Sequence, residues 1–246
     1  MKAAIQGVLR QFGIQFVRLP AGKSSYETVL PAATYSPWNS SADFQATYQQ
    51  IKGHTLVDIY RCWELWTLVG QIADRDGGIL EIGVWRGGTG ALMAKRALMA
   101  GSRSPVYLCD TFEGVVKAGS HDVHYKGSEH ADTSQHVVED LLRTLNVTNV
   151  QILKGIFPDQ TAHLIEAGTR LKLCHIDVDV YQSAKDVMAW IWDRMLPGGI
   201  IVYDDYGFSI CEGITKYVNE QVNESDRLVL HNLNGHAIVI KSPAGC

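Results

Sequence analysis

Residues 171–186 read LKLCHIDVDVYQSAKD, an apolar run that ends in two acids and leads into a polar segment. The apolar run predicts a buried strand over 171–179, and SAKD, which starts at Ser183, has the form of a capping box that opens a helix. Successive strand residues point to opposite faces, so Asp177 and Asp179 should point the same way. Burying an unpaired carboxylate is costly, and two acids in an apolar strand therefore indicate a functional site.

The same arrangement recurs in GGIIVYDDYG, residues 198–207, where Asp204 and Asp205 end an apolar run that predicts a strand over 200–206. Asp204 lies 204 − 177 = 27 residues after Asp177, which is the length of a unit that joins neighbouring strands through a helix. Neighbouring strands are about 4.8 Å apart. Asp177, Asp204 and Asp205 can therefore converge on one point.

Strand and helix patterns alternate along the rest of the chain. Apolar runs predict further strands at 78–84, 105–112 and 150–155, and two strands about Asn234-Gly235 within 227–242. Helical periodicity predicts helices at 56–73, 89–101, 134–145 and 212–223, with a short helix after Pro158. The PGG triplet at 197–199 predicts a turn before the strand over 200–206. We therefore expect a doubly wound, mostly parallel α/β sheet, Rossmann-like, with an antiparallel C-terminal hairpin.

Composition narrows the class of partner. The chain has 246 residues, a net charge of −4 and no long run of Lys or Arg, which argues against a nucleic-acid partner and favours a small molecule. Its five cysteines are scattered without a CxxC motif, as is typical of a reduced, cytoplasmic protein. No apolar run approaches the roughly 20 residues that a membrane span needs.

The N-terminal part differs from the rest. Residues 1–19 carry apolar positions at helical spacing and no acid, so they predict a helical arm. Such an arm can pack on its own domain, contact a second subunit of a homo-oligomer, which we expect, or dock weakly on an anionic membrane. We place an arm and lid at 1–55 and the main domain at 56–246.

The four aspartates indicate a cation site. Converging carboxylates repel one another unless a cation lies between them, and oxygen ligands favour Mg²⁺, Mn²⁺ or Ca²⁺ over zinc. The alternative is that these acids are helix caps or ion pairs at strand ends.

A second signal comes from the first strand and its turn. In LEIGVWRGGTG, residues 80–90, Glu81 stands inside an apolar strand and four glycines lead into a helix, where a ligand could approach the backbone closely. The spacing is not GxGxxG, so a dinucleotide-dependent oxidoreductase is not favoured. Asp110 ends the next strand, where an acid can accept hydrogen bonds from ribose. These features fit a site that binds a nucleoside and has no phosphate-binding motif, so a ligand such as S-adenosylmethionine is favoured.

The motifs EIGVWRGGTGALM, DTFEGV, IDVDVYQSAKD and GGIIVYDDY resemble the macrocin O-methyltransferase family of class I S-adenosylmethionine-dependent enzymes, which methylate sugar hydroxyls of glycosylated natural products. The resemblance runs from about 56 to 222. It implies Mg²⁺, or Mn²⁺, held by Asp177, Asp204 and Asp205, with Asp179 as general base. It also implies a cofactor site formed by the following residues: Glu81, Gly83, Asp110, Phe112, Gly155 and Asp177.

Other functions remain open on the sequence. A catechol-type O-methyltransferase would use similar metal chemistry on an aromatic diol, and a non-catalytic nucleoside-binding protein would need no base. The loop at 115–133 contains three histidines, His121, His124 and His130, and is either a mobile lid or a second metal site. Arg86 either meets the cofactor carboxylate or pairs with a nearby acid.

Overall fold

The computed structural model describes residues 25–26 and 33–243, and the predicted arm at 1–19 lies outside them. One compact unit runs from Ser36 to Cys246. It contains a short 3₁₀ helix, η1 (Pro37–Ser40), and helix α2 (Ala42–Ile51), both within the segment predicted as arm and lid. Phe44 of α2 is fully buried, and its ring centroid lies 5.7 Å from that of Trp66 on helix α3 (Ile59–Gln71).

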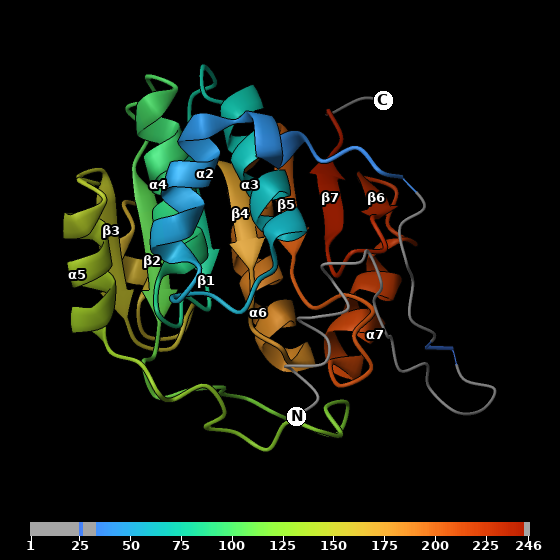
Figure 1. The fold of residues 1–246 in the computed structure, drawn as a ribbon. Coiled ribbons are helices and arrows are strands. Elements are labelled where there is room, and N and C mark those ends of the chain that lie inside the picture. The colour runs from blue at the N-terminus through green and yellow to red at the C-terminus, as the bar shows by residue number, and fades with distance from the viewer. Residues whose placement is uncertain (1–24, 27–32, 244–246) are drawn as a thin grey trace, which may run out of the picture. The chain divides into compact units, whose positions relative to one another are not determined.

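The centre of the unit is a seven-stranded sheet (Figure 1). Five parallel strands are extended beyond β5 by an antiparallel hairpin, and the strand order is β3-β2-β1-β4-β5-β7-β6. The strands are β1 (Gly78–Ile82), β2 (Val106–Asp110), β3 (Val150–Lys154), β4 (Leu171–Ile176), β5 (Met195–Tyr203), β6 (Arg227–His231) and β7 (Ala237–Lys241). The predicted doubly wound fold with its antiparallel C-terminal hairpin is confirmed.

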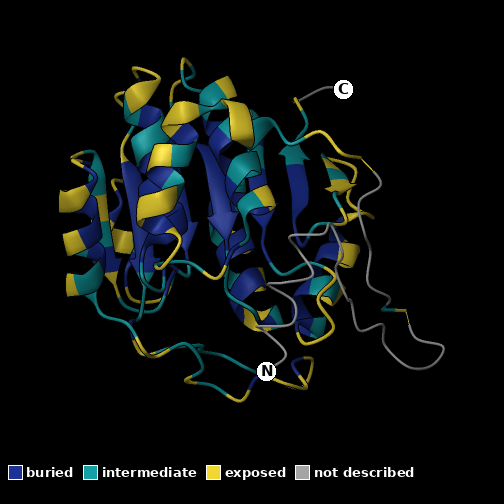
Figure 2. Cartoon of the chain, viewed as in Figure 1, coloured by how far each residue is buried: buried dark blue, intermediate teal, exposed yellow. Residues whose placement is uncertain are grey.

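Helices cover both faces of the sheet. One face packs against α2, α3 (Ile59–Gln71), α4 (Gly88–Met99) and α5 (Gln135–Thr144), and the other against α6 (Tyr181–Ile191) and α7 (Glu212–Gln221). Two short 3₁₀ helices, η2 (Ala162–Leu164) and η3 (Trp192–Arg194), complete the described elements. Alternate residues of β1 serve the two cores: Ile79 faces α3 and α4, whereas Leu80 faces α6. Both faces are therefore apolar, and strands β1, β2 and β4 are buried almost throughout, whereas the edge strands β3 and β6 are partly exposed (Figure 2).

Two predicted boundaries are wrong. Strand β4 ends at Ile176, so Asp177 and Asp179 lie in the following loop, and Asp179 has φ +62°. Helix α6 begins at Tyr181 without a side-chain cap of its own, because Asp122 of a distant loop accepts from the Tyr181 N–H at 2.9 Å. The predicted capping Ser183 instead donates its hydroxyl to the Val116 carbonyl.

The predicted PGG turn is also wrong. Strand β5 already begins at Met195 and passes through Gly198, which has φ +67°. The pairing with β4 shifts from Leu171–Met195 to Leu173–Ile200, so the extra residues form a bulge inside the strand. Glycine permits this backbone because it has no Cβ.

No helix in the described part of the chain is long and apolar enough to cross a membrane.

The sheet order places the candidate site. Strand order reverses between β1 and β4, and ligands of open α/β sheets bind beyond the carboxyl ends of the strands at that point. Asp110 ends β2, Asp177 follows β4, and Asp204 follows β5. The predicted convergence of Asp177 and Asp204 thus rests on the adjacent parallel strands β4 and β5.

Candidate active site

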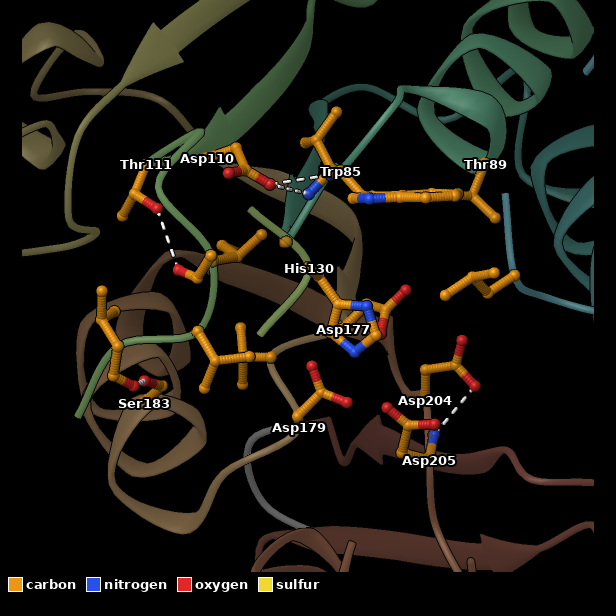
Figure 3. Close-up of a pocket in the computed structure, with 18 of the residues that line it drawn as sticks. Trp85, Thr89, Asp110, Thr111, His130, Asp177, Asp179, Ser183, Asp204 and Asp205 are labelled. Atoms are coloured by element: carbon orange, nitrogen blue, oxygen red, sulfur yellow. Dashed lines mark hydrogen bonds between the residues drawn. The ribbon is translucent and has the colours of Figure 1, made fainter. Parts of the chain in front are cut away.

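A cavity of about 330 Å³ lies at the carboxyl ends of the parallel strands. Most of the predicted site residues line it: Gly83, Asp110, Gly155, Asp177, Asp179, Asp204 and Asp205. Asp177, Asp179, Asp204 and Asp205 gather on one side, and Asp110 lies across the cavity from them (Figure 3). The cavity therefore has an acidic side and a side built on the glycine-rich turn.

Gly83 is the first residue after β1 and lines the cavity. It has φ +83°, and a Cβ added there would lie 1.6 Å from the carbonyl oxygen of Asp177. The Gly83 N–H also donates to the Cys109 carbonyl at 3.0 Å. The glycine is thus required by the close approach of the β1 and β4 ends, in addition to any approach of a ligand.

Asp110 organises the same turn. Its Oδ2 accepts the backbone N–H groups of Val84 and Trp85 at 2.6 and 2.8 Å, and its Oδ1 accepts the Phe112 N–H at 2.6 Å. Trp85 has φ +47°, so the turn after β1 follows an unusual backbone path that Asp110 stabilises. Each carboxylate oxygen can accept two hydrogen bonds, so Oδ1 can accept one more, from a ligand hydroxyl beside the turn.

Two residues of the predicted cofactor set do not line the cavity. Glu81 is fully buried, and its Oε1 lies 2.9 Å from Nδ1 of His175 on the neighbouring strand. Phe112 is 7% exposed and packs in the core on the α4 face. The role of both residues in binding the cofactor stays a prediction.

On the acidic side the charges strongly perturb one another. Burial, followed by the charge of Asp204, raises the pKa of Asp177 well above its usual value, and the same two causes raise the pKa of Asp205. Asp204 behaves differently. Burial alone would raise its pKa, but His236, Arg61 and His175 together lower it. Asp204 is therefore held as an anion beside two crowded carboxyl groups.

The partner of Asp204 is Arg61, which sequence analysis missed. Arg61 lies on α3, is 6% exposed, and directs Nη1 to Oδ1 of Asp204. Its Nε donates to Asp58 at 3.0 Å, and Asp58 also caps the first turn of α3. The sequence does hold a signal for Arg61: it is a cation on the buried face of a helix whose other residues on that face are apolar. It is next to Cys62 and one turn before Leu65.

The ligand atoms form two groups that could hold a metal ion within the described residues. One joins Asp179, Asp205 and Cys211, and the other joins His175, Asp204 and His236, each with its atoms within 4.8 Å of one another. Of the set implied by the resemblance, Asp205 belongs to the first group, Asp204 to the second and Asp177 to neither. Asp204 is turned towards Arg61. The donors nevertheless suit a hard divalent cation, since Asp177, Asp179 and Asp205 bring carboxylate oxygens to one side of the cavity.

The histidine-containing loop reaches the site through a tyrosine that sequence analysis passed over. Tyr125 is 8% exposed, and its hydroxyl donates to Oδ1 of Asp179 at 2.5 Å. His130 of the same loop lines the cavity, as Figure 3 shows, whereas His121 approaches Lys216 and His124 pairs with Glu212. The loop thus covers the cavity, and the three histidines do not converge on a second metal site.

Arg86 has a partner outside the cavity. Its Nη2 lies 2.7 Å from Oδ2 of Asp132, and its guanidinium stacks over the Trp85 ring at 4.6 Å. The Trp85 Nε1 donates to the same Asp132 at 2.9 Å. Of the two roles considered for Arg86, the structure shows the pairing with an acid, which joins the glycine-rich turn to the end of the loop.

Comparison with known proteins agrees with this geometry. The sequence matches the macrocin O-methyltransferase (TylF) family over residues 31–229, which is most of the chain. The protein belongs to this family. The match includes η1 and α2 and extends on both sides beyond the 56–222 over which the motifs resemble it.

Individual relatives match parts of the chain. An enzyme of Streptomyces olivaceus, 8-demethyl-8-(2,3-dimethoxy-alpha-L-rhamnosyl)-tetracenomycin-C 4'-O-methyltransferase, is 32% identical over 171 residues, which are 64% of this chain and 64% of that enzyme. The solved structure of the O-methyltransferase NovP has a TM-score of 0.66 at 24% identity, covering 77% of this chain and 83% of NovP. An O-methyltransferase of Bacillus cereus, solved in complex with SAH, has a TM-score of 0.54 at 19% identity and covers 82% of this chain and 91% of its own. The two structures share the fold.

Proposed function

We propose that this protein is an S-adenosylmethionine-dependent O-methyltransferase that acts on a sugar hydroxyl of a glycosylated natural product. The observation that carries the proposal is the family match together with one cavity that presents a glycine-rich turn opposite four aspartates. The Streptomyces olivaceus relative is named for methylation of a rhamnosyl glycoside, which supports a glycoside as acceptor.

The turn side of the cavity is proposed to bind the methyl donor, which supplies an electrophilic methyl group. Gly83 and Gly155 line the cavity just after β1 and β3, and Asp110 ends β2 between these strands, with spare acceptor capacity on Oδ1. The Bacillus cereus structure in complex with SAH shows that a relative of this fold takes such a nucleoside. Holding the donor here would place the acceptor on the acidic side.

The acidic side is proposed to bind and deprotonate the acceptor. Asp177, Asp204 and Asp205 are the proposed ligands of Mg²⁺ or Mn²⁺, whose charge would acidify a nearby hydroxyl. Asp179 is the proposed general base, since it faces the cavity beside them and does not need to ligate the ion. Tyr125 donates to Oδ1 of Asp179, and Asp205 interacts with the same carboxylate.

Acceptor screening tests the proposal. With labelled S-adenosylmethionine and Mg²⁺, we expect methyl transfer to a rhamnosyl glycoside and none to a catechol. Mass spectrometry of the product identifies the methylated hydroxyl. If only the catechol is methylated, the acceptor is an aromatic diol and not a sugar. If the nucleoside binds but no acceptor is methylated, a non-catalytic binding protein is favoured.

A further inference from the structure

A row of five side chains crosses the sheet behind the acidic side of the cavity. It runs from Glu81 on β1 through His175 on β4, Asp204 after β5 and His236 before β7 to Glu64 on α3. The row follows from the strand pairing. Glu81 is directly opposite His175 in the β1–β4 register, and Asp204 and His236 flank the pair Tyr203–Ala237.

Each imidazole is anchored by a glutamate. Nδ1 of His175 lies 2.9 Å from Oε1 of Glu81, and Nδ1 of His236 lies 2.6 Å from Oε2 of Glu64. Both histidines are fully buried. A ring nitrogen held by a carboxylate fixes which way the ring points, so the opposite nitrogen of each histidine has a defined direction.

In both histidines the opposite nitrogen, Nε2, points towards Asp204. Nε2 of His236 lies 3.6 Å from Oδ1 of Asp204, and Nε2 of His175 lies 4.0 Å from Oδ2. Neither Nε2 atom has a hydrogen-bond partner, although both are buried. Two buried polar nitrogens aimed at one carboxylate are costly unless they act on it. The row therefore brackets Asp204 from two sides.

We propose that His175 and His236 are positioning residues that orient the Asp204 carboxylate towards the divalent cation, and that Glu81 and Glu64 act through them. The inference rests on the proposed function, in which Asp204 is a metal ligand. Ligating carboxylates are commonly held by such outer partners, and loss of one typically costs 10–100-fold in metal affinity.

A transition-metal ion bound directly by His175, Asp204 and His236 is the competing use of the same atoms. Two contacts disfavour it. The guanidinium of Arg61 already lies on Oδ1 of Asp204, and the Asp205 N–H donates to that oxygen at 2.8 Å. Oδ1 of Asp204, the oxygen that faces His236, is therefore already occupied, and only Oδ2 is left to bind an ion.

The test compares two substitutions of one residue. His236→Asn keeps a donor where Nδ1 meets Glu64 but removes the group aimed at Asp204, whereas His236→Gln keeps a group that reaches Asp204. In the presence of saturating S-adenosylhomocysteine, Mn²⁺ affinity is measured by calorimetry and by electron paramagnetic resonance. We expect His236→Asn to weaken Mn²⁺ binding by ~10–100-fold, with a smaller loss for His236→Gln.

The controls separate the possible failures. S-adenosylhomocysteine affinity should not change in either variant, and His136→Asn on the surface should leave Mn²⁺ affinity unchanged. If His236→Asn does not fold, Glu64→Gln, whose side chain is 21% exposed, should weaken Mn²⁺ binding several-fold. Equal losses in the two His236 variants, or no loss in a folded variant, would overturn the inference while the proposed function stands.

Two further outcomes are decisive. A visible Co²⁺ absorption band that disappears in His236→Asn would make the imidazole a direct ligand and would also overturn the positioning role. A wild-type protein that binds neither S-adenosylhomocysteine nor Mn²⁺ would remove the proposed function first, and the inference with it.

Discussion

Replacing Asp179 by asparagine is expected to lower kcat by ~10²–10⁴-fold, the usual contribution of a general base. Asparagine has nearly the same shape and its amide oxygen can still accept from the Tyr125 hydroxyl, so the loop should stay in place. The amide cannot accept the proton of a sugar hydroxyl. Because a base acts in the transition state, kcat and kcat/KM should fall together.

The measurement is steady-state methyl transfer to the best glycoside acceptor, with S-adenosylhomocysteine affinity measured on the same preparations. Affinity for the nucleoside should be unchanged, since Asp179 lies across the cavity from Asp110. Asp193→Asn, an exposed change outside the cavity, is the matched control. A kcat of Asp179→Asn close to that of the wild type would remove Asp179 from the mechanism.

Replacing Asp204 by alanine is expected to destabilise the fold severely. Asp204 is 1% exposed and contacts Arg61, which is itself buried, so the substitution leaves a buried guanidinium without its main partner. Breaking a buried ion pair by removing one partner typically costs ~3–5 kcal/mol in the free energy of unfolding. Asp58 still accepts from Arg61 Nε, which places the expected loss near the lower end of that range.

Urea denaturation measures this loss, and two variants serve as references. Asp140→Ala removes the partner of Arg143, and because both side chains are at least half exposed, this surface pair should be worth only about 0–1 kcal/mol. Arg61→Met combined with Asp204→Ala should be more stable than Asp204→Ala alone, because no buried charge is left unpaired. A loss below about 1 kcal/mol for Asp204→Ala would mean that the pair is not maintained in solution.

Part of the site could be predicted from the sequence because the geometry of parallel sheets is general. Carboxyl ends of neighbouring parallel strands meet at one edge, so Asp177, Asp204 and Asp205 were expected to lie close together once the strands were recognised. The spacing of 27 residues between Asp177 and Asp204 correctly predicted that β4 and β5 are neighbours.

The rest could not be predicted because it depends on tertiary packing. Arg61 comes from a helix that precedes the sheet, Tyr125 from a loop without periodicity, and His236 from the closing hairpin. Nothing in the local pattern of these segments says which strand end they will meet. The start of α6 was mispredicted for the same reason, since its first N–H is capped by Asp122 from a distant loop.

Calorimetric titration of S-adenosylhomocysteine, with and without Mg²⁺, tests the central claim that this cavity binds a nucleoside donor beside a divalent cation. We expect the wild type to bind the nucleoside under both conditions and to show a separate Mg²⁺ heat. Asp205→Asn should keep nucleoside binding and lose that Mg²⁺ heat, and it leaves the Arg61–Asp204 contact intact. Absence of nucleoside binding to a folded wild-type protein under every condition would contradict the account.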